Sequence, residues 1–177
     1  MTQNRPQTDE YAPYYAKYIA LVPEGEIPDI LETQLHEMKT LLGPIGEQRA
    51  EFRYAPDKWS IKEVLGHISD TERIFGYRIL RIARGDQTAL SGFEQDDYVR
   101  EGNFSRRKLT ELLEEFTAVR RGTLALLRSF DEQAWTRRGV ANQKGISVRA
   151  LAFITAGHEC HHRRILEERY LPALPRA

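Results

Sequence analysis

The sequence contains very little cysteine, with one residue, Cys160, among 177. An intramolecular disulfide is therefore excluded, and a chain without disulfides fits a reducing compartment. The first residues also lack a basic segment followed by an apolar one, which is the pattern of a secretory signal peptide. We therefore expect a cytoplasmic protein.

Net charge is absent as well. Lys and Arg together number 26, and Asp and Glu together number 26. The basic excess that proteins show when they bind nucleic acids or anionic membranes is missing. No apolar run approaches the ~20 residues that span a bilayer. We expect neither a nucleic acid nor a membrane among the partners.

Strand-like alternation of useful length is missing too, and the chain instead shows helical periodicity. Apolar residues recur every three to four positions in four segments, which are 29–42, 60–84, 106–130 and 148–171. Four amphipathic helices predict an all-α fold, a four-helix bundle. The connections between them are long for a simple up-and-down bundle, at roughly 43–59, 85–104 and 131–146. We therefore expect long crossover connections, which could supply walls for a site.

Residues 11–22, ahead of the first predicted helix, carry an aromatic pattern with four tyrosines. Tyrosine is favoured where one side is apolar and the other meets water. We therefore expect an N-terminal arm, residues 1–22, that packs on a bundle domain formed by residues 23–177. A lid or a subunit contact is the alternative for the arm.

Histidines form the most informative pattern in the last predicted helix. His158 and His162 are one turn apart and fall on one face, about 40° from each other. Two imidazoles on a core-facing stripe suit a divalent metal better than they suit packing, although such a pair also arises by coincidence. His67, in the second predicted helix, is a lone histidine beside an apolar stripe, which alone indicates a core residue.

The same segment also has the H-E-x-x-H spacing of zinc metalloproteases, in which Glu159 would be the general base. Those enzymes take a third ligand from downstream. Ile165 stands where their continuation has glycine, and no further histidine follows. The protease interpretation is therefore disfavoured, and a third ligand should come from upstream.

Two stretches resemble one family. The run from Trp59 to Asp70, WSIKEVLGHISD, is similar to the second-helix signature of the DinB-like (DinB/YfiT) superfamily, and His158-x-x-x-His162 is similar to its last helix. The segment FEQDDY, residues 93–98, resembles a branch of that family. The resemblance covers most of the chain. It implies a four-helix bundle, often a homodimer, with a divalent metal held by three histidines, which here are His67, His158 and His162.

The implied site suggests a function. Three neutral imidazoles leave metal positions open, and some members of the family resemble thiol-dependent transferases. We expect a metal-dependent transferase that activates a low-molecular-weight thiol for a small-molecule substrate, with zinc or nickel as the metal. The alternatives are a metal-dependent hydrolase that uses water with Glu159 as base, and a non-catalytic, stress-associated metal-binding protein. Cys160 should point away from the metal, and His161 is a rival to His162.

Overall fold

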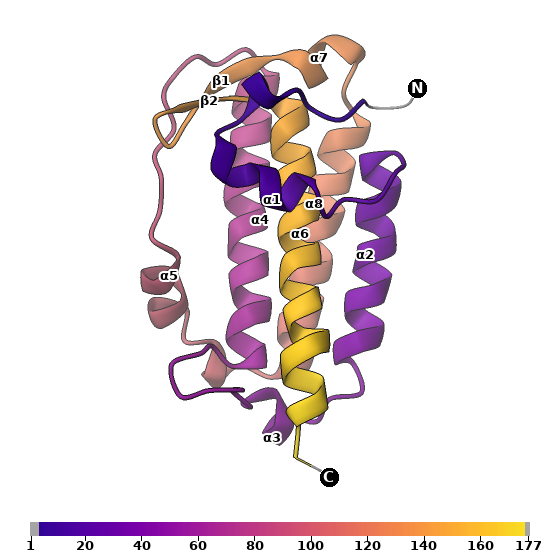
Figure 1. Cartoon of the computed structure of the whole chain (residues 1–177), viewed down its shortest axis with the longest axis vertical. Coiled ribbons are helices and arrows are strands. Elements are labelled where there is room, and N and C mark those ends of the chain that lie inside the picture. The colour runs from indigo at the N-terminus through magenta and orange to yellow at the C-terminus, as the bar shows by residue number, and fades with distance from the viewer. Residues whose placement is uncertain (1–3, 176–177) are drawn as a thin grey trace.

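Four long helices form the body of the protein (Figure 1). The computed structural model describes residues 4–175. The long helices are α2 (Ile27–Leu42), α4 (Ile61–Ala83), α6 (Leu109–Arg128) and α8 (Val148–Ile165). α2, α4 and α6 each bury an apolar stripe and expose a polar one, as the periodicity predicts. α8 differs, because its residues from Ala150 to Glu159 are all buried. The predicted all-α four-helix bundle is confirmed.

The order of the helices follows from their connections. α4 packs against α6 and α8, and α2 packs against the same two helices, so α2 lies diagonally across the bundle from α4. α4 and α6 run parallel, because the segment between them returns along the outside of the bundle before α6 begins (Figure 1). This is the predicted long crossover connection.

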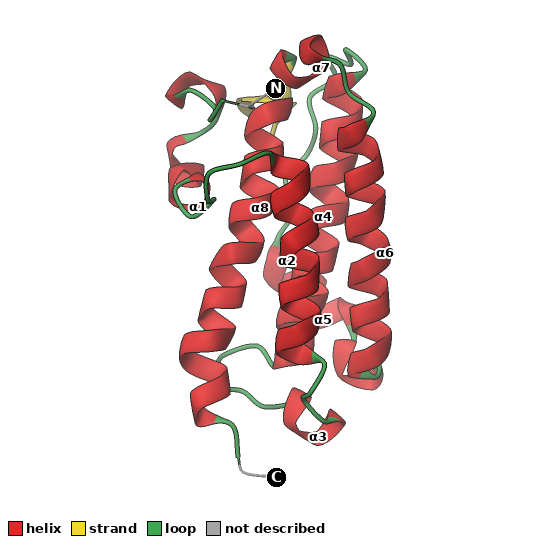
Figure 2. Ribbon diagram, turned by 90° about the vertical axis from the view of Figure 1, so that its right-hand side faces the viewer, coloured by secondary structure: helices red, strands yellow, loops and turns green. Residues whose placement is uncertain are grey.

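Short elements occupy the connections and the chain ends. The short helices are α1 (Ala16–Ile19), α3 (Glu47–Ala50), α5 (Gln95–Gly102) and α7 (Glu132–Thr136). Single turns of 3-10 helix lie at Thr8–Glu10, Pro13–Tyr15, Phe104–Arg106 and Leu171–Ala173, and α8 continues into a π-helix at Leu166–Tyr170. Figure 2 shows that most of the loops lie at the two ends of the bundle. No helix within residues 4–175 has the length and hydropathy of a membrane span.

A small hairpin is present where no strand was expected. β1 (Arg138–Ala141) pairs antiparallel with β2 (Lys144–Ser147), in the connection before α8. Asn142 and Gln143 turn the chain with φ of 49° and 63°, a left-handed conformation that asparagine tolerates. Four residues a strand are too few to show a clear alternation, which is why the sequence did not reveal them.

The helix starts are predicted well where a cap is present and poorly elsewhere. Ser60 caps α4, with its Oγ accepting from Glu63 N at 3.2 Å while Glu63 accepts from Ser60 N at 2.7 Å. Ser147 caps α8 by accepting from Ala150 N. The start predicted at residue 29 is wrong, since α2 begins at Ile27 and Asp29 lies in its first turn. α6 likewise begins at Leu109, because the residues after Asn103 form a separate 3-10 turn.

A buried polar network joins the four long helices. Arg120 of α6 is fully buried and donates to both carboxylate oxygens of Glu72 on α4, at 2.9 to 3.1 Å. It also donates to the Leu31 carbonyl of α2 at 2.8 Å. Gln34 of α2 continues the network by donating to the Ala156 carbonyl of α8 at 3.0 Å. These bonds fix how the helices sit relative to one another.

The N-terminal arm packs on α8. Its residues Tyr18, Ile19 and Val22 are buried. Close approach requires Gly157, since a Cβ there would lie 2.0 Å from the Tyr18 carbonyl oxygen. The arm therefore crosses α8 one residue before His158.

The network generates a stability prediction. Replacing Arg120 by Met leaves Glu72 buried without its cation, so we expect the free energy of unfolding to fall by about 3–5 kcal/mol in urea denaturation. Adding Glu72→Leu should recover most of that loss, because the buried charge is then gone.

Arg128→Met is the matched control, since Arg128 pairs with Glu32 on the surface of the protein. An exposed pair contributes about 0–1 kcal/mol. Equal losses in Arg120→Met and Arg128→Met would show that the network does not hold the bundle together.

Candidate metal centre

Three histidines converge where α4 meets α8. His158 Nε2 lies 3.1 Å from His67 Nε2 and 3.1 Å from His162 Nε2. The nearest ring nitrogens of all three lie within 4.8 Å of one another. The antiparallel packing of α4 on α8 thus brings together the residues that the family resemblance had implied, although 91 positions separate His67 from His158.

This convergence cannot be satisfied by hydrogen bonds alone. A nitrogen of neutral imidazole either donates one hydrogen or accepts with one lone pair. His158 Nε2 has two Nε2 neighbours and can bond well to only one of them. One cation would instead accept all three lone pairs. Tetrahedral zinc with Zn–N bonds of about 2.0–2.1 Å would place ligand nitrogens about 3.3 Å apart, close to the observed spacing.

The surroundings keep these imidazoles neutral, as metal ligands must be. Burial, with a smaller effect of His161, lowers the pKa of His67 to about 4. Burial also holds the pKa values of His158 and His162 well below their usual range, helped by the neighbouring histidines. Thr71, one turn after His67, lies 3.5 Å from its Nδ1 and leaves Nε2 free to face the other rings.

Aromatic rings enclose the cluster. Trp59 stacks on His162 at a ring distance of 6.4 Å and lies 4.7 Å from the ring of His67. Tyr18 of the arm meets His158 edge-on at 5.6 Å and His161 at 5.4 Å. His161 therefore faces the arm, while His162 faces the cluster, which favours His162 over its rival.

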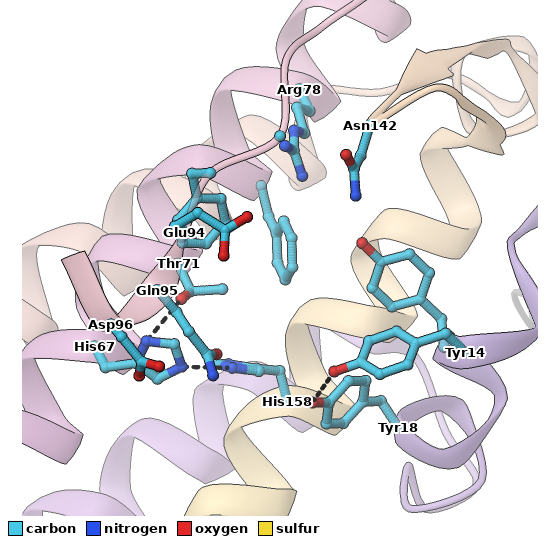
Figure 3. Close-up of a pocket in the computed structure, with 14 residues that line it drawn as sticks. Tyr14, Tyr18, His67, Thr71, Arg78, Glu94, Gln95, Asp96, Asn142 and His158 are labelled. Atoms are coloured by element: carbon cyan, nitrogen blue, oxygen red, sulfur yellow. Dashed lines mark hydrogen bonds between the residues drawn. The ribbon is translucent and has the colours of Figure 1, made fainter. Parts of the chain in front are cut away.

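A cavity of about 280 Å³ leads to His67 and His158 (Figure 3). Its walls come from the arm, from α4, from the crossover connection and from the hairpin turn. Two of the long connections thus do supply walls. The segment that includes Phe93 and Asp96 lies beside α4, not over a bundle end, because α5 packs along that helix. The lining residues are Tyr14, Tyr15, Tyr18, His67, Thr71, Phe75, Arg78, Gly92, Phe93, Glu94, Gln95, Asp96, Asn142 and His158.

Glu159 and Cys160 lie elsewhere. Cys160 Sγ accepts from Gln34 Nε2 at 2.9 Å and lines a different hollow, between α2 and α8. Glu159 is buried without a hydrogen-bond partner, 3.5 Å from Arg163 Nε, and burial raises its pKa to about 7. It is not among the described residues that line the cavity.

Two carboxylates follow His67 closely on α4. From the sequence, Asp70 and Glu72 are candidate acceptors for a ring N–H of a ligand histidine. Asp70 instead pairs with Arg73, and Glu72 with Arg120. The sequence analysis missed Arg78 and Asn142. Arg78 follows His67 by eleven residues, about 20° away in helical phase, so a polar residue on the ligand face was the available signal.

The depressed histidine pKa values predict how the metal-free protein responds to acid. The unfolded chain protonates His67 near pH 6.5, but the folded protein does so only near 4. The unfolded state therefore binds more protons in this window, and the free energy of unfolding decreases as the pH falls. Between pH 7 and 5 the contribution of His67 is about 2 kcal/mol.

Urea denaturation of chelator-treated protein at pH 7, 6 and 5 measures this slope. We expect folded protein at pH 7, since its apolar core does not involve an ion, and a shallower slope in His67→Asn. His36→Asn, exposed on α2, should keep the original slope. If the free energy of unfolding of His67→Asn falls with pH as steeply as that of His36→Asn, the burial argument is contradicted.

Comparison with known proteins agrees with the architecture. The model of the DinB superfamily matches residues 30–166. The structure is similar to YfiT from Bacillus subtilis, described as a probable metal-dependent hydrolase with an unusual four-helix bundle topology, with a TM-score of 0.71 and 14% identity over 94% of this chain and 91% of that one.

It is also similar to a mycothiol-dependent maleylpyruvate isomerase, with a TM-score of 0.65 and 11% identity over 89% of this chain. The match spans 66% of the isomerase. No curated protein matches the sequence. Such low identities show a shared fold alone, whereas the family model covers most of the sequence. The chain belongs to the DinB superfamily.

Proposed function

We propose that His67, His158 and His162 hold one divalent metal ion, and that the protein is a transferase that uses this ion to activate a low-molecular-weight thiol. The observation that carries the proposal is the convergence of three neutral Nε2 atoms, on His162 and on His67 and His158, the last two of which line an open cavity. A cation held by three neutral ligands keeps its charge and can stabilise a thiolate in a remaining coordination position.

No thiol of the chain lines the cavity among the described residues, which supports an external one. The only cysteine, Cys160, lines a different hollow. The cavity does contain hydroxyl groups, on Thr71 and three tyrosines. Thr71 contacts a ring nitrogen of His67, and burial raises the pKa values of Tyr15 and Tyr18, which disfavours their phenolate forms. A small thiol from solution therefore supplies the attacking sulfur.

Other residues of the chain would orient the histidines and enclose the cluster. Thr71 Oγ1 lies 3.5 Å from His67 Nδ1 and can accept its N–H, which would leave Nε2 free to face the cluster. Trp59 and Tyr18 pack against the imidazoles and reduce the access of water. We propose that the arm, residues 1–22, acts as a wall of the substrate cavity, with the bundle of residues 23–177 as the catalytic body.

A hydrolase is the second candidate, because YfiT is described as a probable metal-dependent hydrolase. It would use the same three histidines and water in place of the thiol. Glu159 was the expected base for it. Its carboxylate lies near Arg163 and outside the cavity lining, so this position favours the transferase.

Metal content tests the ligand set. Protein purified without a tag or chelator should contain one equivalent of a divalent metal, with zinc or nickel expected. His67→Ala should lose most of it, because two imidazoles remain. His36→Ala is the matched control and should retain the metal. Full occupancy in His67→Ala would exclude the three-histidine site.

Turnover tests the reaction. Metal-loaded protein is supplied with a haloarene or an epoxide, with and without a panel of cellular thiols, and separately with activated esters and amides. We expect thiol-dependent turnover that falls at least a hundredfold in His162→Ala and persists in Cys160→Ser. Thiol-independent hydrolysis that is lost in Glu159→Gln would support the hydrolase. With metal bound, absence of both reactions would favour the non-catalytic, stress-associated protein.

A further inference from the structure

The end of the cavity opposite the histidines contains a buried cation with no anionic partner among the described residues (Figure 3). The structure buries two arginines in the part of the chain that it describes, Arg78 and Arg120, with 3% and 0% of their surface exposed. Arg120 has Glu72 as its bidentate partner. Arg78 forms no ion pair with a described residue, and its one hydrogen bond there is from Nη2 to the Ser91 carbonyl oxygen, at 2.6 Å.

Burial of a guanidinium without an anion is unfavourable, and arginine remains protonated when it is buried. The Ser91 carbonyl fixes the orientation of the group but does not neutralise it. Nε and Nη1 form no hydrogen bonds within the described chain, although Arg78 lines the cavity. The N–H donors on Nε and Nη1 thus remain available for a carboxylate oxygen.

The surroundings of Arg78 fit the same ligand. Asn142 reaches the Arg78 end of the cavity from the hairpin turn (Figure 3). It approaches closely because its neighbour is Gly92, where a Cβ would lie 2.5 Å from Asn142 Oδ1. Its amide can donate further hydrogen bonds. Phe75 also lines the cavity, with its ring 6.1 Å from the ring of His158 and 5.9 Å from the Arg78 guanidinium, and it offers an apolar face to a ring.

Two carboxylates also face the cavity, and they disfavour an anion close to them. Glu94 and Asp96 are exposed residues at and just after the start of α5. Neither forms an ion pair with Arg78 in the described structure. They repel an anion, so a carboxylate in the cavity gains most against Arg78, the one arginine among the lining residues.

We propose that Arg78, with Asn142, binds the carboxylate of the substrate, and that the substrate class is small, unsaturated or aromatic carboxylic acids with an electrophilic carbon. This inference rests on the proposed function for the reaction, but the anion site itself does not depend on it. Arg78 stands eleven residues after His67, about 16 Å along α4, and helical side chains lean back toward the N-terminus. The guanidinium is then on the order of 10 Å from the histidines, a span that suits one aromatic ring.

For a chlorinated nitrobenzoate the step balances. The thiolate sulfur forms a bond to the ring carbon that carries chlorine, the carbon–chlorine bond breaks, and chloride leaves. The proton of the thiol passes to solvent. Arg78 contacts the carboxylate and takes no part in the bond changes.

Binding and turnover test the proposal separately. In calorimetric titrations of metal-loaded protein, 3-nitrobenzoate should bind about ten- to a hundredfold more tightly than 3-nitrobenzamide. Arg78→Met should abolish this preference, and Arg78→Lys should retain part of it. Arg84→Met removes an exposed arginine from the end of the same helix and should change nothing. Glu94→Gln should strengthen binding of the acid. Circular dichroism and metal content confirm that each variant is folded and loaded.

Turnover of 4-chloro-3-nitrobenzoate and of its amide, with a small thiol, gives the second readout. The acid should be preferred in kcat/KM by a similar factor, and Arg78→Met should remove the preference. If turnover is absent but Arg78-dependent binding is present, the anion site stands and the transferase fails. Equal affinity for acid and amide in the unmodified protein, or a preference that survives Arg78→Met and so reflects the metal, overturns the proposal.

Discussion

The antiparallel packing of α4 on α8 is the constraint on which the site depends. It brings His67 Nε2 to 3.1 Å from His158 Nε2 across two helices that are far apart in sequence. The buried pair of Glu72 and Arg120 lies within the same bundle and ties α4 to α6 and α2. A rotation of either α4 or α8 by a fraction of a turn would separate the imidazoles, so the polar network and the metal centre require the same arrangement.

One cavity then joins the histidine cluster and a cationic side chain. At one end the histidines are held neutral by burial, as metal ligands must be, and at the other end Arg78 lacks an anion among the described residues. The walls come from segments that the bundle does not need for its core, namely the arm, the crossover connection and the hairpin turn. In the proposed function the helices would supply the chemistry, and the connections would select the substrate.

Much of the fold and part of the candidate site follow from the sequence. The rest could not be predicted, because it depends on contacts between residues far apart in the chain. Helical period and the Ser60 cap predict α4 because local interactions decide them, and the pair at His158 and His162 is a local pattern too. The role of His67 depends on a contact between helices, so it needed the family resemblance. Arg78 went unnoticed because its missing partner is visible only in three dimensions. The homodimer and the cytoplasmic location stay predictions.

X-ray absorption at the metal edge of the loaded protein tests the central claim most directly. The account predicts three nitrogen ligands at about 2.0–2.1 Å and, after a small thiol is added, one sulfur ligand at about 2.3 Å. Cys160→Ser should give the same sulfur signal, because the sulfur comes from the added thiol. Fewer than three imidazole nitrogens, or no sulfur ligand at saturating thiol, would contradict the account.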